Sequence, residues 1–311
     1  MSLKKTIKSG LGPLVRAGRR TLYRRKFERS AKLLSQRLGD RMKIATRIEY
    51  GDQHDHLWKK LQEKAPPHIR FQMMPLDKDP LTNRLKKCWA QYGEFYGNGG
   101  QEKCLEHSLT FELLNFEKVR RYCDVAASFS RIERVLAAEW EGVEYWKQDL
   151  EYTSDFLQRR IGGFAQHMQD VPGGFFDALT LHCSFEHFSG TADTEFVAEV
   201  DRVLSPNGAC LILPLYIGAK PCVYFDPTSV SEEQLRTYDS EAELRALWDY
   251  RQEHGRYYSP ETLISRVLGR LPSTLIATMV RFTGQESIGP GIYLHFGLVL
   301  HRSTSVFRYS S

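Results

Sequence analysis

The sequence is short of several features that mark whole classes of protein. None of its apolar runs approaches the roughly 18 residues that a membrane-spanning helix requires, and its N-terminus lacks the uninterrupted apolar segment of a secretory signal. Its six cysteines form no CxxC pair and are too sparse for a disulfide-stapled fold. We therefore expect reduced thiols and a cytoplasmic protein.

Acidic residues are scarce at the N-terminus. Residues 1–47 hold 15 Lys or Arg and only two acids, Glu28 and Asp40, whereas the remainder holds 28 basic and 36 acidic residues. The net charge of +5 therefore hides a basic leader joined to a mildly acidic body.

The leader, residues 1–47, is predicted to be helical in two pieces, with a break around Gly10, Gly12 and Pro13. In the second piece, apolar residues recur every three or four positions and so share one helical face: Tyr23, Phe27, Ala31, Leu34 and Leu38. Such a helix can pack on the body, lie peripherally on an anionic membrane, or touch nucleic acid. We favour packing on the body, keep peripheral membrane contact as the second interpretation and disfavour nucleic acid.

The pattern changes near residue 118, after a mixed helical cap region at 48–117. Strands are expected at 119–125, 142–150, 161–165, 176–181 and 209–215, with helices at 130–139 and 194–204. A long insertion, 217–258, precedes a helix at 259–268 and two closing strands at 274–282 and 292–301. The alternation predicts an α/β fold: a Rossmann-like, doubly wound, mostly parallel seven-stranded sheet within 118–311.

The segment 176–216 carries the most informative motifs. Its apolar strand leads into a polar cluster between His182 and His187, and ligands bind at the carboxyl ends of strands in open α/β sheets. The motifs are Phe176-Asp177, Glu186-His187, Arg202-Val203-Leu204 and Ser205-Pro206-Asn207-Gly208. This set closely resembles the class I S-adenosylmethionine-dependent methyltransferases of the small-molecule, type 11 kind. The resemblance implies a closing antiparallel strand and S-adenosyl-L-methionine as the cofactor.

Two further family signatures follow the first and second strands. In the loop that is glycine-rich in the family, the acid is Asp124, and Ala126, Ser128 and Ser130 replace the three glycines. The acid that the resemblance implies for the ribose hydroxyls is Asp149, 25 residues after Asp124. A carboxylate suits a vicinal diol because it accepts two charge-assisted hydrogen bonds.

At the third signature, Phe164 and Ala165 occupy the positions where the family carries an acid for the adenine amino group and then a small residue. Phe164 is thus a second departure from the family pattern, after the missing glycines. The cofactor-binding set implied by the resemblance is Asp124, Ala126, Ser128, Asp149, Phe164, Ala165 and His182.

Methyl transfer from a sulfonium is an in-line displacement, in which the protein mainly positions donor and acceptor. A hydroxyl acceptor calls for a general base, and His187 and His182 are the catalytic candidates because they follow the fourth strand. Cys183, Glu186 and His187 have no specific metal-ligand spacing, so no metal is predicted. The insertion is expected to cap the acceptor site.

We therefore expect a methyltransferase acting on a small molecule or on a glycan- or lipid-linked intermediate. The alternative is a scaffold or binding protein, with or without bound cofactor, that kept the fold and lost the chemistry, which the missing glycines and Phe164 favour. An RNA methyltransferase anchored by its basic leader ranks last, because the sequence has no recognisable RNA-binding module.

Overall fold

The computed structural model describes residues 3–49, 53–248, 250 and 252–302. By its internal contacts the chain divides into two compact units. The larger comprises Tyr50–Ala219 and Tyr258–Ser311, and the smaller comprises Met1–Glu49 and Lys220–Tyr257. The smaller unit thus joins the leader to most of the insertion. The functional division into 1–47, 48–117 and 118–311 stays a prediction.

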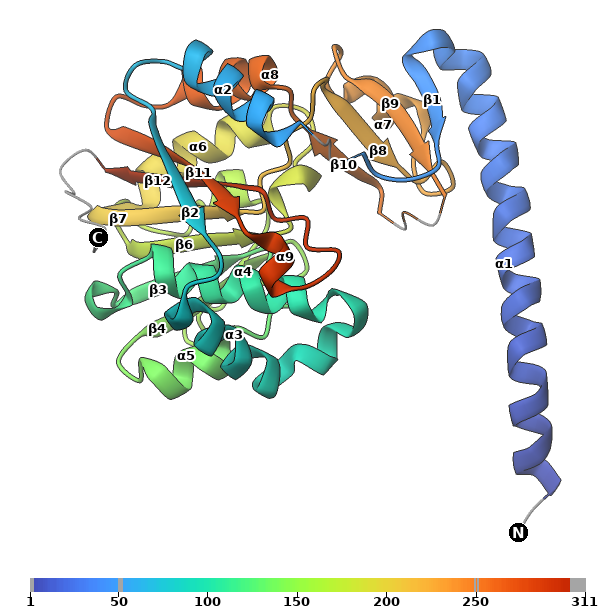
Figure 1. The fold of residues 1–311 in the computed structure, drawn as a ribbon, viewed down its shortest axis with the longest axis horizontal. Coiled ribbons are helices and arrows are strands. Elements are labelled where there is room, and N and C mark those ends of the chain that lie inside the picture. The colour runs from blue at the N-terminus through green and yellow to red at the C-terminus, as the bar shows by residue number, and fades with distance from the viewer. Residues whose placement is uncertain (1–2, 50–52, 249, 251, 303–311) are drawn as a thin grey trace. The chain divides into compact units, whose positions relative to one another are not determined.

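An eight-stranded sheet forms the centre of the larger unit, in the order β2-β11-β12-β7-β6-β3-β4-β5 (Figure 1). Its strands are β2 (Arg70–Pro75), β3 (Arg121–Val125), β4 (Glu144–Asp149), β5 (Arg160–Gly162), β6 (Phe176–His182), β7 (Leu204–Leu213), β11 (Leu275–Thr283) and β12 (Phe296–Arg302). All neighbours run parallel except β12, which is antiparallel to both β7 and β11. The mostly parallel fold and its antiparallel strand are confirmed. The predicted count of seven strands is one short, because the cap region adds β2 beside β11.

Helices cover both faces of this sheet, which makes it doubly wound. One face carries α2 (His54–Lys64), α6 (Ala192–Val203) and α8 (Pro260–Arg266), and the other carries α3 (Asp79–Tyr92), α4 (Gly100–Leu113) and α5 (Glu133–Glu139). Shorter helical segments are η2 (Gly93–Gly99), η3 (Phe116–Lys118), η4 (Ala165–His167), η5 (Phe185–His187), η6 (Leu268–Arg270) and α9 (Gln285–Ile288). Successive strand residues point to opposite faces, so Leu179 packs in one apolar core and Ala178 in the other.

The Ser205-Pro206-Asn207-Gly208 motif lies within β7, which begins at Leu204 and not at the predicted residue 209. Phe176 pairs with Leu204 and Ala178 with Ala209, so residues 205–208 bulge out of the ladder. A Cβ atom on Gly208 would lie 2.8 Å from the Phe176 carbonyl oxygen, so glycine is required at this close approach.

The leader forms one long helix, α1 (Leu3–Leu38), in the smaller unit. The helix continues through Gly10, Gly12 and Pro13, so the predicted break is wrong. Proline removes one backbone donor from the helix, but the flanking turns keep their helical geometry. Among the described residues, no helix is long and apolar enough to cross a membrane.

A four-stranded sheet completes the smaller unit, in the order β1-β9-β8-β10. It contains β1 (Met42–Ala45), which follows η1 (Gly39–Arg41), together with β8 (Cys222–Phe225), α7 (Glu232–Thr237), β9 (Glu243–Leu247) and β10 (His254–Tyr257) from the insertion. Phe27, Ala31 and Leu34 of α1 are buried in one core with Val223 and Leu244. The shared apolar face predicted for the leader is therefore confirmed at these three positions.

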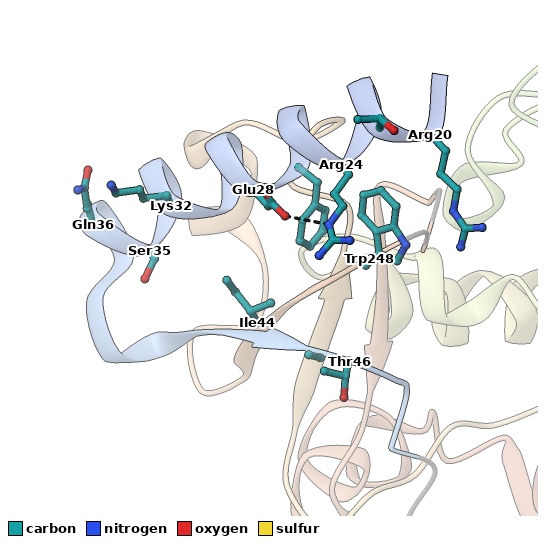
Figure 2. Close-up of a pocket in the computed structure, with 12 residues that line it drawn as sticks. Arg20, Arg24, Glu28, Lys32, Ser35, Gln36, Ile44, Thr46 and Trp248 are labelled. Carbon is teal, nitrogen blue, oxygen red and sulfur yellow. Dashed lines mark hydrogen bonds and ion pairs between the residues drawn. The ribbon is translucent and has the colours of Figure 1, made fainter. Parts of the chain in front are cut away.

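A groove of about 980 Å³ lies beside α1 within the smaller unit (Figure 2). Arg20, Arg24 and Lys32 of α1 line it, with Ile44 of β1 and Trp248 beyond β9.

Candidate functional site

The predicted site residues gather at one edge of the large sheet. β5, β4, β3 and β6 are consecutive parallel neighbours, so their carboxyl ends meet at that edge. Asp149 ends β4 and His182 ends β6, while Ala126 follows β3 directly. In open α/β sheets this is where ligands bind.

The loop after β3 keeps a glycine-like turn without the glycines. Ala126 adopts a left-handed backbone with φ of 57°, a region that costs an L-residue roughly 1–2 kcal/mol. The Ala127 N–H donates to the Gln148 carbonyl at 3.0 Å and so fixes the loop against β4. Cys183, directly after β6, is also left-handed, with φ of 51°. Strained non-glycine residues at neighbouring strand ends are typical of functional sites.

Asp149 organises the same loop. Its Oδ2 accepts the Ser128 N–H at 2.9 Å and its Oδ1 accepts the Glu151 N–H at 3.1 Å. An ionised carboxylate has about four acceptor positions, so capacity remains for two hydroxyl donors.

Large apolar side chains are exposed after three adjacent strands of this edge. Phe129 is 71% exposed after β3, Leu150 is 62% exposed after β4, and Phe164 is 60% exposed after β5. Ala165 is buried at the start of η4. Exposed apolar groups concentrated at one site indicate contact with a ligand.

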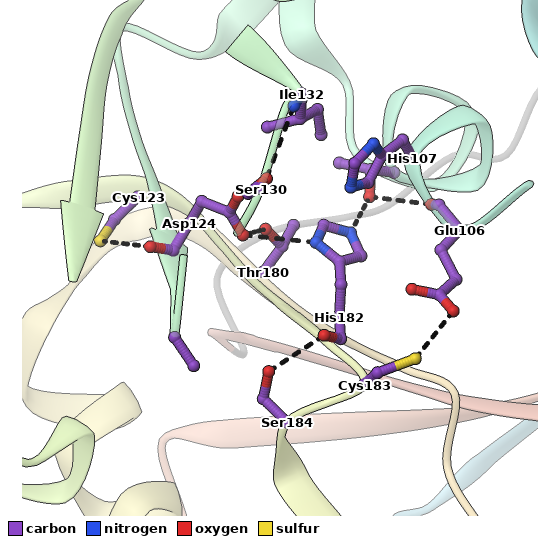
Figure 3. A network of polar contacts seen from close by, with 12 residues as sticks. Glu106, His107, Cys123, Asp124, Ser130, Ile132, Thr180, His182, Cys183 and Ser184 are labelled. Carbon is purple, nitrogen blue, oxygen red and sulfur yellow. Dashed lines mark hydrogen bonds and ion pairs between the residues drawn. The ribbon is translucent and has the colours of Figure 1, made fainter. Parts of the chain in front are cut away.

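Asp124 is the centre of a buried polar network (Figure 3). Its Oδ1 accepts from Thr180 Oγ1 at 3.2 Å and lies 3.3 Å from His182 Nδ1, and its Oδ2 accepts from Tyr145 at 3.2 Å. Burial alone would raise the pKa of Asp124, but the hydrogen bond and charge of His182 hold that pKa below its ordinary 3.8. His182 Nε2 lies 2.8 Å from Thr110 Oγ1, so both ring nitrogens are engaged.

Helix α4 and the segment before it add residues to the site that sequence analysis missed. Tyr96, Lys103 and His107 line a cavity of about 60 Å³ together with Asp124, Val125, Ala126, Phe129, Ser130 and His182. Eleven of the fourteen residues of α4 are buried, including polar ones on several sides of the helix. A helix buried all round shows no amphipathic stripe. Polar and apolar residues alternate irregularly along α4, so its sequence did not mark Lys103 and His107 as site residues.

The polar residues of α4 are paired in a second cluster. Lys103 Nζ lies 2.6 Å from Glu106 Oε2, and Cys183 Sγ donates to Glu106 Oε1 at 3.0 Å. Glu102 Oε2 accepts the Tyr293 N–H at 3.2 Å. Burial, followed by the charge of Glu106, raises the pKa of Glu102 to about 8.

His187 lies apart from the small cavity, at the end of η5. Its side chain is 34% exposed, and Nε2 lies 3.7 Å from Glu186 Oε1. Of the described residues, no group of three or more His, Cys, Asp or Glu is arranged to hold a metal ion.

Comparison with known proteins gives a family match over part of the chain. Residues 118–212 match the family model of a methyltransferase domain. The chain matches no curated protein.

Several solved structures share features of the fold. One is the 1,6-didemethyltoxoflavin-N1-methyltransferase of Burkholderia thailandensis, with bound 1,6-didemethyltoxoflavin and S-adenosylhomocysteine. The two chains are 11% identical, the match covers 72% of this chain and 88% of that chain, and the TM-score is 0.42. Another is a putative methyltransferase of Haloferax volcanii in complex with the Trm112 methyltransferase activator. It is 10% identical to this chain, the match covers 72% of this chain and 99% of that chain, and the TM-score is 0.42.

Proposed function

We propose that this chain, whose residues 118–212 belong to the methyltransferase domain family, is an S-adenosylmethionine-dependent methyltransferase. Its acceptor is a small molecule or a glycan- or lipid-linked intermediate. The observation that carries the proposal is the left-handed Ala126, which keeps the sharp turn of a cofactor loop at the end of β3 although the glycine is gone.

The residues at the sheet edge fit the cofactor in chemistry. Asp149 would accept the ribose hydroxyls while it still holds the Ser128 N–H. Leu150, Phe164 and Phe129 offer exposed apolar surface for the adenine ring. The cofactor, when bound, supplies an electrophilic methyl group on a sulfonium.

The two histidines predicted as bases have different surroundings. His182 is held by Asp124 and Thr110 on its two ring nitrogens, which supports a positioning role. His187 is partly exposed beside Glu186, so it is the better candidate to take a proton from an acceptor hydroxyl.

The scaffold alternative has support from the same loop. The methyl group that Ala126 adds in place of glycine acts against close approach of a ligand to the backbone. Affinity for the cofactor distinguishes the methyltransferase from a cofactor-free scaffold, whereas methyl transfer to an acceptor distinguishes it from a scaffold that still binds the cofactor.

Calorimetric titration with S-adenosylhomocysteine tests the proposal. The wild-type chain and Asp149→Asn should differ, because the variant loses the carboxylate charge. Asp155→Asn is the matched control, since Asp155 also accepts two backbone N–H groups but is exposed in the loop beyond β4. We expect binding by the wild type and the control, and a roughly tenfold or greater loss in Asp149→Asn. If the folded wild type does not bind S-adenosylhomocysteine, the scaffold is favoured over the methyltransferase.

A further inference from the structure

We propose that helix α4 completes the cofactor site, with Lys103 and His107 holding the carboxylate of an α-amino acid zwitterion. This inference rests on the proposed function and specifies which part of the cofactor the small cavity receives. It concerns residues outside the matched domain segment, 118–212.

The first observation is an unsatisfied nitrogen in the cavity wall. His107 is fully buried, and its Nδ1 lies 2.8 Å from the Tyr92 hydroxyl. Its Nε2 is buried without a hydrogen-bond partner. Buried polar atoms are nearly always bonded, and His107 is among the residues that line the cavity, so its orphan nitrogen is available for a bond to a ligand there.

The protonation state of His107 supports this role. Burial, followed by the charges of His182 and Lys103, lowers the pKa of His107 well below 6.5, so the ring is neutral. If the Tyr92 hydroxyl donates to Nδ1, Nε2 carries the proton and is a donor toward the cavity.

The second observation is the charge distribution around the cavity. Lys103 is a cation in the wall, and its ion pair with Glu106 uses one of three ammonium donors. The Ser130 hydroxyl and the Asp124 carboxylate line the same space. A bare anion would be repelled by Asp124, whereas a zwitterion places its ammonium near that carboxylate and its own carboxylate near Lys103.

Size also favours the amino-acid end of the cofactor. The cavity of about 60 Å³ is equivalent to roughly two water molecules at about 30 Å³ each. That volume suits the carboxylate and ammonium of an amino acid. The nucleoside would lie outside it, toward Asp149 and the exposed apolar side chains.

The test compares two ligands that share the nucleoside and sulfur. S-Adenosylhomocysteine carries the amino-acid end, and 5′-methylthioadenosine lacks it. The variants are His107→Phe and the double variant Lys103→Met/Glu106→Gln, which removes the pair together so that no charge is left buried alone. His301→Phe is the control, because it makes the same substitution at a buried histidine of β12 that does not line the cavity.

Calorimetry should show that both variants lose roughly tenfold or more in affinity for S-adenosylhomocysteine, while 5′-methylthioadenosine affinity stays unchanged. His301→Phe should resemble the wild type. Equal loss for both ligands would mean a merely structural role, and unchanged S-adenosylhomocysteine affinity would also overturn the inference. A folded wild type that binds neither ligand would refute the proposed function itself.

A separate observation concerns the groove beside α1 (Figure 2). Arg20, Arg24 and Lys32 bring positive charge to it, while Glu28 also lines it and pairs with Arg24 at 3.0 Å, which leaves a net positive lining. Phe27, Ile44 and Trp248 bring apolar surface. We infer that this groove receives an anionic phospholipid, with its headgroup at the basic side chains and acyl carbons against the apolar ones.

Exposed apolar residues next to the basic ones support a membrane surface as the occupant. Leu22 is 67% exposed, Leu33 48% and Ile44 61%. Long basic side chains at a bilayer surface keep their charges in the headgroup region while their stems cover apolar surface. Nucleic acid would use the charges but not these apolar side chains.

Vesicle flotation with the full chain tests this second inference. Binding is expected to phosphatidylcholine vesicles that contain phosphatidylglycerol and not to phosphatidylcholine alone. Arg20→Glu/Arg24→Glu/Lys32→Glu should abolish it. The matched control, Lys86→Glu/Lys118→Glu/Arg120→Glu, makes the same charge change at exposed residues of the larger unit and should still bind. Equal loss in both variants, no flotation of the wild type, or binding only to RNA would overturn it.

Discussion

The imidazole of His182 joins Asp124 to Thr110, with Nδ1 3.3 Å from the Asp124 carboxylate and Nε2 2.8 Å from the Thr110 hydroxyl. This contact connects β3, β6 and α4 through side chains that are all buried. The cap helix is thereby tied to the sheet edge at the residues predicted to bind the cofactor.

Replacing His182 should destabilise the protein near neutral pH and weaken the loss of its stability on acidification. The pKa of Asp124 is held below 3.8 in the folded state, so this carboxylate contributes stability above its unfolded pKa and loses it as pH falls through the folded value. In His182→Phe the main group that lowers this pKa is gone. We expect urea denaturation to show a loss of roughly 1–3 kcal/mol near neutral pH and a smaller further loss on acidification. An unchanged acid dependence would contradict the assigned pairing.

Relieving the backbone strain after β3 should stabilise the fold. Ala126→Gly places glycine at a φ of 57°, where we expect a gain of about 0.5–1 kcal/mol after the entropic cost of glycine. Ala127→Gly is the matched control, because Ala127 is buried and not left-handed, and it should destabilise. Equilibrium unfolding in urea measures both. A loss of stability in Ala126→Gly would show that the turn is not strained.

Ionisation of Glu102 should lower the free energy of unfolding as the pH rises. Its pKa is about 8 in the folded state and ordinarily 4.5, so the folded state binds the proton more tightly and stability is lost between these values. Glu102→Gln removes that loss. The variant should gain little at about pH 5 and up to about 4 kcal/mol over the wild type at about pH 9.

The control for this pH effect is Glu112→Gln, an exposed position on the same helix. Denaturation curves of the control and the wild type should remain parallel across the pH range. If Glu102→Gln behaves like the control, Glu102 is already ionised in the folded state.

The leader should stabilise the smaller unit through a single apolar face. Phe27 is 4% exposed and packs in the core of that unit, whereas Leu22 is 67% exposed. Phe27→Ala should cost roughly 3–5 kcal/mol, and Leu22→Ala less than about 0.5 kcal/mol. Limited proteolysis of the insertion measures the difference, since both segments belong to one unit. Equal rates of proteolysis in the two variants would show that the leader does not stabilise the insertion.

Local sequence patterns predicted most of the large sheet. β3, β6 and α6 follow from apolar runs and helical spacing that depend only on neighbouring residues. β2 was missed, because its residues, Arg70–Pro75, end in Met-Met-Pro and pair with a strand about two hundred residues later. The pairing of β1 with β9 is equally distant in sequence, so no local signal joins the leader to the insertion.

The candidate site was predicted in part. Family motifs identified Asp124, Asp149 and His182, which the fold brings to one sheet edge. Lys103 and His107 were missed, because buried polar residues on α4 have no periodic signature. The roles of all the predicted site residues, His187, Phe164 and Ala165 included, stay predictions.

Amide hydrogen exchange with and without S-adenosylhomocysteine tests the cofactor site most directly. The proposed function predicts slower exchange on ligand addition in residues 126–130, 149–152 and 162–165, the segments that follow β3, β4 and β5. Residues 70–75 form β2, the outermost strand on the side of the sheet opposite β5, and their exchange rates should not change. Unchanged exchange in all three segments at saturating ligand, or protection confined to other parts of the chain, would contradict a cofactor site at this sheet edge.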